Sequence, residues 1–185
     1  MAKNNSANVS AAKPQVGGAI FWAPAETALP TDASTELDAA FECVGYVSTE
    51  GVTEKETRSY EKHAAWGGDT VASAQTEYVK VYSFKMIETN ATTMKIRYGA
   101  ANVTVGEDGK VTQVKHNAKE LPEGRWVIEM IIAGRILRKV MPRGKMEEVG
   151  DITYNHSDLV SYDASIGLLP DENGDYETDY YAEVA

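Results

Sequence analysis

Residues 125–141 read RWVIEMIIAGRILRKVM. Two strand-like runs, 125–132 and 135–141, flank Ala133-Gly134, which predicts a tight reversal between antiparallel strands. Alternation along a strand puts one apolar set on a single face of the first run: Trp126, Ile128, Met130 and Ile132. The matching face of the second run mixes charge with apolar bulk: Arg135, Leu137, Lys139 and Met141. This hairpin predicts antiparallel β structure at the centre of the fold.

The same signals recur outward from this hairpin. β-branched and aromatic residues predict a strand at 77–87, and Asp108-Gly109 predicts a second hairpin that joins 101–105 to 110–114. Pro142-Arg143-Gly144 predicts another turn, followed by strands at 146–154 and 158–168. One helix is predicted at 90–98, with Thr89 or Asn90 as its N-cap and Gly99 at its C-terminus, and 31–41 predicts a short helix or turn. The fold class is mainly β: a β-sandwich with one flanking α-helix.

The chain has 185 residues, which predicts one domain with tails. Hydrophobic residues make up 43% and charged residues 25%, as is typical of a globular protein, and the formal net charge is −10. A chain this acidic is a poor candidate for gripping DNA or an anionic membrane, because phosphate binding needs clustered Lys and Arg. A surface past which DNA must slide should, in contrast, repel it.

The sequence predicts no enzyme, metal site or cofactor. Cys43 is the single cysteine, and the three histidines lack ligand spacing: His63, His116 and His156. The segment 155–158 holds Asn, His, Ser and Asp, but neighbours on a strand point to opposite faces and do not form a triad. Asp171 opens a segment that begins like a calcium loop, yet Tyr176 and Ala182 replace its required Gly and Glu. The chain also has no apolar run of the roughly 20 residues that span a bilayer, so we expect no membrane insertion and an intracellular origin.

Three regions flank or interrupt the strands. Residues 1–16 predict a flexible N-terminal arm, 17–169 the β domain, and 170–185 an acidic, tyrosine-rich tail, either mobile or a docking arm. The region that interrupts the strands is a charged excursion, 50–66, which ends in Trp66 beside Gly67-Gly68. Charges of both signs argue against burial, whereas the tryptophan argues against a plain linker. Trp126 is expected in the core, and Trp22 and Trp66 suit either the core or a protein contact.

The ordered motifs resemble those of the major tail tube proteins of long-tailed, non-contractile bacteriophages, from about residue 17 to about residue 168. They are Ile20-Phe21-Trp22-Ala23-Pro24, Thr27-Ala28-Leu29-Pro30-Thr31-Asp32, Gly45-Tyr46-Val47-Ser48-Thr49-Glu50-Gly51-Val52 and Trp66-Gly67-Gly68-Asp69-Thr70-Val71, then a strand, the Glu88-Thr89-Asn90 helix and Tyr98-Gly99. No single motif is diagnostic, and the order of the set carries the resemblance.

The resemblance implies a structural subunit of the virion tail that assembles in the host cytoplasm. Six copies would join inner sheets into a β-barrel ring, and rings would stack into a tube through which double-stranded DNA passes. Tape-measure, terminator and baseplate proteins are the implied partners. The excursion would be a long loop or extended hairpin that contacts the adjacent ring through Glu54, Lys55, Glu56, Arg58, Tyr60 and Trp66. We also expect Asp and Glu to outnumber Lys and Arg on the inner face of the tube.

Two other classes stay open on sequence grounds. A virion decoration or adhesion β-sandwich module would be a stable monomer or trimer with an aromatic patch on its loops. An enzyme, for example a carbohydrate hydrolase, would need a pair of carboxylates that nothing in the sequence selects.

Overall fold

A computed structural model describes residues 4–15 and 17–184, and most of its regular structure is antiparallel β. The strands are β1 (Lys13–Pro14), β2 (Ile20–Pro24), β3 (Glu42–Cys43), β4 (Val47–Ala64), β5 (Thr70–Met86), β6 (Val103–Val105), β7 (Val111–Val114), β8 (Gly124–Ile132), β9 (Arg135–Val149), β10 (Tyr162–Leu168) and β11 (Thr178–Glu183). One α-helix, α1 (Ala91–Tyr98), and two 3₁₀ turns, η1 (Ser6–Asn8) and η2 (Ala100–Asn102), complete these elements. The main sheet runs β3-β2-β8-β9-β10-β5-β4, with β1 beside β8 and β11 beside β9, whereas β6 and β7 form a separate pair.

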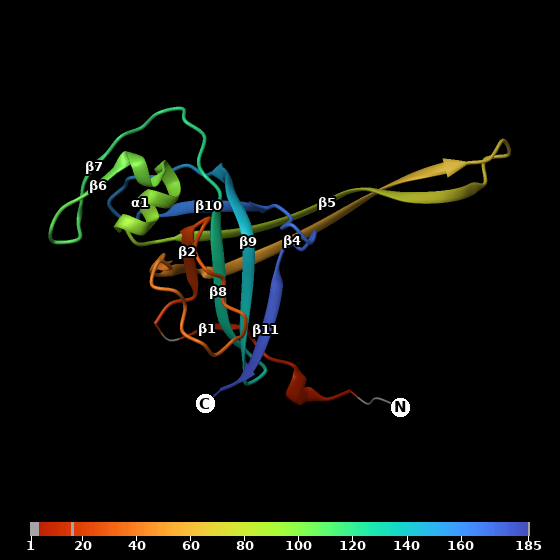
Figure 1. The fold of residues 1–185 in the computed structure, drawn as a ribbon, viewed down its shortest axis with the longest axis horizontal. Helices are drawn as coiled ribbons and strands as arrows, with labels where there is room; N and C mark the ends of the chain where they lie inside the picture. The colour runs from red at the N-terminus through yellow and green to blue at the C-terminus, as the bar shows by residue number, and fades with distance from the viewer. Residues whose placement is uncertain (1–3, 16, 185) are drawn as a thin grey trace.

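The main sheet bends back on itself and encloses the core. Phe84 on β5 and Trp126 on β8 are three strands apart in the sheet order, which in a flat sheet would separate them by about 14 Å. Their ring centroids are instead 6.2 Å apart, edge to face. Figure 1 accordingly shows β4 and β5 crossing the direction of β8 and β9. The two layers of the fold are therefore two parts of one continuous sheet, and their inner faces supply most of the core.

The predicted turn at Pro142-Arg143-Gly144 is wrong, because β9 continues through it as one strand to Val149. The β8–β9 register shifts between Gly124 and Trp126. The facing residues of β9, Pro142 to Gly144, therefore lie at a bulge, where a proline is tolerated although it has no N–H group. A Cβ atom on Gly144 would lie 2.7 Å from Cδ1 of Trp126, so only glycine lets the strand pass the indole. The bulge lets β9 pair with β8 and β11 in its first half and with β10 in its second half.

The other predicted elements largely match the structure. The α1 helix starts after Asn90, whose side chain accepts a 2.8 Å hydrogen bond from the Thr93 N–H group, and ends at Gly99 with φ 86°. The hairpins β6–β7 and β8–β9 are confirmed, although the strand predicted at 158–168 begins only at Tyr162. The segment 31–41 forms turns and no helix, although Asp32 does accept hydrogen bonds from the N–H groups of Ser34 and Thr35.

Segments near both ends of the chain pair with the main sheet. In the N-terminal segment, β1 pairs with β8, and in the C-terminal segment β11 pairs with the first half of β9. Within the tail, Thr178–Glu183 forms β11 on the subunit's own β9. Residues 1–3 and 16 of the predicted arm, and residue 185 of the tail, lie outside the described residues.

Candidate assembly interface

The β4–β5 hairpin leaves the body and projects into solvent (Figure 1). Strand β10 pairs with β5 between Val81 and Met86, and beyond this point no other strand among the described residues lies beside the hairpin. The 12 residue steps from Glu54 to Trp66 span about 40 Å at the rise of a β-strand. A compact domain of this length has a radius of gyration of about 16 Å. The hairpin therefore reaches about as far as the body is wide.

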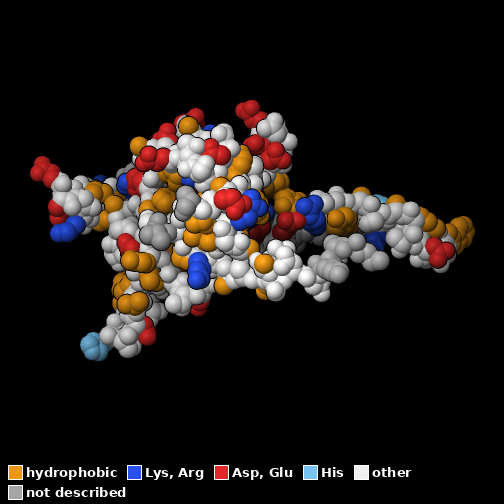
Figure 2. Space-filling model, turned by 90° about the horizontal axis from the view of Figure 1, so that it is seen from below, with side chains coloured by type: hydrophobic (Ala, Val, Ile, Leu, Met, Phe, Trp, Pro, Cys, Tyr) orange, Lys and Arg blue, Asp and Glu red, His pale blue; other side chains and the backbone are white. Residues whose placement is uncertain are grey.

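The tip of the hairpin is a tight turn with two glycines and a solvent-exposed tryptophan. The Ala65 N–H group donates to the Asp69 carbonyl at 2.8 Å, and Gly68, with φ 91°, takes a conformation that favours glycine. Trp66 is fully exposed. Figure 2 shows hydrophobic side chains at the far end of the hairpin, beyond its charged and polar shaft. An exposed aromatic of this size is typical of a protein contact.

A partly buried cluster of charges lies at the base of the hairpin. Lys80 Nζ on β5 lies 2.8 Å from Glu54 Oε1 and 2.9 Å from Glu177 Oε1. Lys139 Nζ on β9 lies 3.1 Å from Glu54 Oε2, 2.9 Å from Glu177 Oε1 and 3.1 Å from Asp179 Oδ2. Two ammonium groups and three carboxylates thus join β4, β5 and β9 to the C-terminal segment. We call these five residues the ion cluster.

The ion cluster holds most of its members in their charged forms. Burial opposes the charge of Glu54, but hydrogen bonds from Lys80 and Lys139 outweigh it and lower the pKa of Glu54 to about 2. Against the opposing effect of burial, hydrogen bonds from Lys80, Tyr82 and Lys139 lower the pKa of Glu177. Glu177 and Asp179 likewise raise the pKa of Lys139, again against burial. Asp179 differs, because burial and the nearby Glu177 charge raise its pKa.

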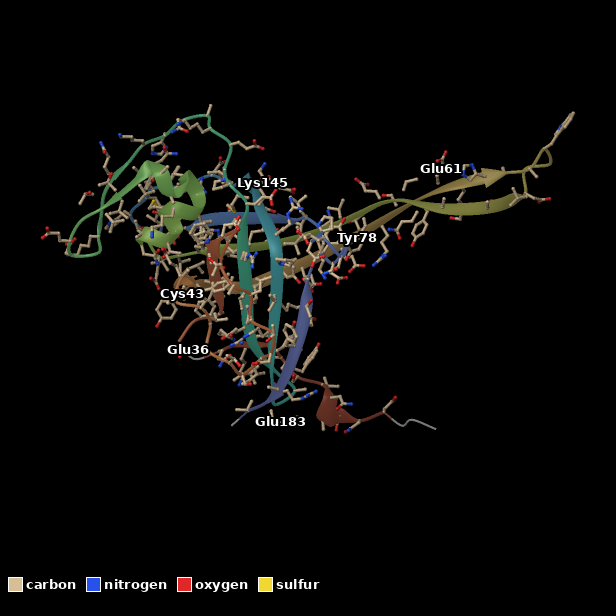
Figure 3. All side chains as sticks on the ribbon, viewed as in Figure 1. Glu36, Cys43, Glu61, Tyr78, Lys145 and Glu183 are labelled. Carbon is tan, nitrogen blue, oxygen red and sulfur yellow. The ribbon has the colours of Figure 1, made fainter. Side chains whose placement is uncertain are left out.

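Two aromatic residues extend the base of the hairpin beyond the ion cluster. Tyr82 donates its hydroxyl to Glu177 Oε2 at 2.6 Å, and burial together with that carboxylate raises the pKa of Tyr82, so the phenol keeps its proton. Tyr78 packs edge-on against Tyr176 of the C-terminal segment, with ring centroids 4.7 Å apart. In Figure 3, Tyr78 lies where the hairpin meets the body, and Glu61 stands clear of it. The C-terminal segment therefore braces the hairpin where it leaves the body.

The structure separates the six predicted contact residues into two groups. Glu54 is bound inside its own subunit by the ion cluster. The other five lie further along the hairpin or on its outer face: Lys55, Glu56, Arg58, Tyr60 and Trp66. Glu56 and Arg58 pair with each other at 2.8 Å, and the Arg58 guanidinium lies 4.4 Å from the centroid of the Tyr78 ring.

The remaining contact residues face solvent. Tyr60 is 55% exposed and its hydroxyl donates to Gln75 Oε1 at 3.5 Å. Lys55 is exposed on the opposite face of β4 from Glu54 and Glu56.

Sequence reasoning missed Lys80, Lys139, Glu177 and Asp179 as positioning residues. The available signal was Lys139, which alternation places with Leu137 and Met141 on a face that packs inward. A lysine there requires a buried counter-charge. Two of its three partners lie 38 and 40 residues further along the chain, a separation that no local pattern specifies.

Across residues 4–15 and 17–184, no group of three or more His, Cys, Asp or Glu side chains is arranged to hold a metal ion. Within the same ranges, no helix has the length and apolar character needed to cross a membrane.

A family model described as phage tail tube protein matches residues 1–180. The chain belongs to the phage tail tube protein family. It is thus a structural protein of the phage tail, and the resemblance seen in the sequence is confirmed. Among curated proteins, no relative matches. Among solved structures, a chain of the "Virion of native gene transfer agent (GTA) particle" is similar to this tail tube protein, with a TM-score of 0.36 and 13% identity over 80% of this chain and 92% of that chain.

Proposed function

We propose that this tail tube protein self-assembles into hexameric rings that stack into the conduit for DNA ejection. Membership of the family and the β-rich, antiparallel fold support this proposal. Copies would assemble in the host cytoplasm with tape-measure, terminator and baseplate proteins and end in the virion tail. A ring closed through strand edges removes the unpaired edges that otherwise promote aggregation.

The projecting hairpin carries the proposal. A lone two-stranded hairpin is at best marginally stable in water, and this one bears a fully exposed tryptophan at its tip. Such a hairpin gains stability when a second copy covers it. We assign Lys55, Glu56, Arg58, Tyr60 and Trp66 to the contact with the adjacent ring, and Glu54 to holding the hairpin at its base. Mixed charges at this contact would fix register more than they add affinity.

The acidic balance of the chain suits a DNA conduit. The formal net charge is −10, and a negative inner wall would keep phosphates from sticking as DNA passes. The proposal therefore includes an inner face on which Asp and Glu outnumber Lys and Arg. A basic inner face in an assembled tube would contradict it.

Shortening the hairpin tests the proposal. Residues 59–77 are replaced by Asn-Gly, which suits a two-residue hairpin turn and leaves Glu54, Lys80 and the ion cluster in place. We expect a folded monomer that forms no tubes in negative-stain microscopy at concentrations where the unchanged chain does. Tubes formed by the shortened chain would refute the assigned role of the hairpin. An unchanged chain that stays monomeric, even with tail initiator proteins, would favour the decoration or adhesion module instead.

A further inference from the structure

An open groove of about 840 Å³ lies on the body between the N-terminal segment and the start of β4. One wall comes from residues 12–15 and 17–19, and the other from 43 and 45–49 with Gly51 and Val52. Its floor includes Ile128 and Met130 of β8, which belong to or pack against the core. Met130 is thus partly exposed in the groove, whereas Ile128 is almost fully buried at its floor.

The β4 wall is built to accept another chain segment. Val47 pairs with Met86 and Val52 pairs with Phe84, so residues 48–51 stand outside the β4–β5 ladder. A Cβ atom on Gly51, or on Gly17 in the facing wall, would meet nothing within 4 Å. Backbone outside a ladder, beside an apolar floor, suits a polypeptide with a large apolar side chain.

The hairpin tip has the complementary properties. Small residues flank Trp66, namely Ala64, Ala65, Gly67 and Gly68, so nothing in its own turn shields the indole. Charges also match. The groove is lined by Lys13 and Glu88, and the tip carries Lys62 and Asp69. Within the part of the chain that the structure describes, none of these four forms an ion pair.

The tip cannot reach the groove of its own subunit. The hairpin points away from the body over about 40 Å at the rise of a β-strand, and Figure 3 places Cys43 of the groove wall on the side of the body away from the tip. A tip that fills the groove of a second copy leaves that copy's own tip free for a third. Such a head-to-tail contact repeats from copy to copy, in a closed ring or in an open series.

We infer that the groove is the receptor for Trp66 and the hairpin tip of a second copy of this chain. The inference rests on the proposed function, in which the hairpin contacts another subunit, and it names the receiving surface. Trp66 acts as the buried anchor, Met130 and Ile128 as its apolar floor, and residues 48–51 as the wall that approaches the incoming backbone. Aromatic anchors seated in pockets typically dominate the affinity of such contacts.

Photocrosslinking from the tip tests the inference. Trp66 is replaced by p-benzoyl-L-phenylalanine, also a bulky aromatic, and isotopically labelled and unlabelled chains are mixed, assembled and irradiated. We expect mixed-label crosslinks from position 66 to residues 12–19, 43–52 or 128–130. The same probe at Tyr60, mid-hairpin, should crosslink elsewhere. Tubes whose position 66 crosslinks to another surface would overturn the groove assignment and leave the proposed function standing. A chain without tubes or intermolecular crosslinks would overturn both.

A blocked groove gives an independent readout. Thr49→Trp places an indole at the groove wall, whereas Thr53→Trp on the same strand lies outside the groove and serves as the matched control. We expect Thr49→Trp to raise the protein concentration needed for tube formation about tenfold, as loss of an interface anchor does, with an unchanged monomer melting temperature. Thr53→Trp should leave both values unchanged. Equal assembly of the two variants would refute the inference.

Discussion

Glu177 Oε1 lies 2.9 Å from Lys139 Nζ, and both side chains are about nine-tenths buried. This contact ties the C-terminal segment to β9, and Lys80 ties the same carboxylate to the base of the hairpin at 2.9 Å. The segment that ends the chain and the hairpin proposed to link subunits therefore share one ion cluster. A change in the cluster should alter the position of β11 and the direction of the hairpin together.

Replacement of Lys139 by methionine should destabilise the subunit strongly. It leaves the buried Glu177 and the partly exposed Asp179 with one ammonium fewer. Removing one partner of a buried ion pair, such as that of Lys139 with Glu177, costs about 3–5 kcal/mol in the free energy of unfolding. Urea unfolding followed by tryptophan fluorescence measures the loss. Lys145→Met is the matched control, because its partner Glu120 is 81% exposed and exposed pairs contribute less than about 1 kcal/mol. Equal losses for the two variants would contradict the role of the ion cluster.

The ion cluster also predicts an acid transition. Glu54 and Glu177 have lowered pKa values in the folded state, so their contribution is present above the ordinary pKa of 4.5 and is lost as the pH falls toward about 2. The raised pKa of Asp179 works in the opposite direction, because that group disfavours its charged form in the fold. Two lowered groups outweigh one raised group, so we expect stability to fall between pH 4.5 and 2. Amide hydrogen exchange should show β11 losing protection first.

Glu177→Gln provides the control for this transition. The amide keeps the shape of the side chain and does not titrate, so the variant should be less stable at pH 7 and its stability should depend less on pH below 4.5. A variant with the same acid dependence as the unchanged chain would assign the transition to other carboxylates.

Gly144→Ala should destabilise the fold through sterics alone. The added Cβ would lie 2.7 Å from Cδ1 of Trp126 and 2.9 Å from Cγ2 of Ile166, both in the core. Overpacking of this kind typically costs about 1–3 kcal/mol in the free energy of unfolding. Gly67→Ala at the hairpin tip is the matched control, because its Cβ would meet nothing within 4 Å. Chemical denaturation should separate the two variants, and a neutral Gly144→Ala would mean that β9 can shift away from the indole.

Local signals were sufficient for much of the fold. Ala133-Gly134, Asp108-Gly109 and the Asn90 cap each specify a structure through residues a few positions apart, and all three are confirmed. The turn predicted at Pro142-Arg143-Gly144 was wrong, because the same residue types occur in turns and in bulges. The difference depends on Trp126, which lies on the neighbouring strand and which a local pattern does not place.

The candidate site was likewise predicted only in part. Charges of both signs indicated an exposed segment, interpreted as a long loop or an extended hairpin, and the structure has a hairpin there. The sequence did not distinguish Glu54 from Glu56, two residues apart on the same face. The distinction comes from Lys80 and Lys139, whose ammonium groups contact Glu54 from distant parts of the chain.

Glu54 and Trp66 should therefore affect different steps, although both lie on the same hairpin. Glu54→Gln removes a charge held by two lysines, so it should lower the monomer melting temperature. Trp66→Ser alters a fully exposed side chain, for which effects on monomer stability usually stay within about 0.5 kcal/mol, and it should instead suppress tube formation. Calorimetry of the monomer and light scattering during assembly measure the two effects. Tyr154→Ser, which changes a 75% exposed aromatic on the body, controls for the mere loss of an exposed ring and should alter neither. A Trp66→Ser monomer that melts early but assembles normally would reverse the assignment, because the indole would then support the hairpin and not the contact between copies.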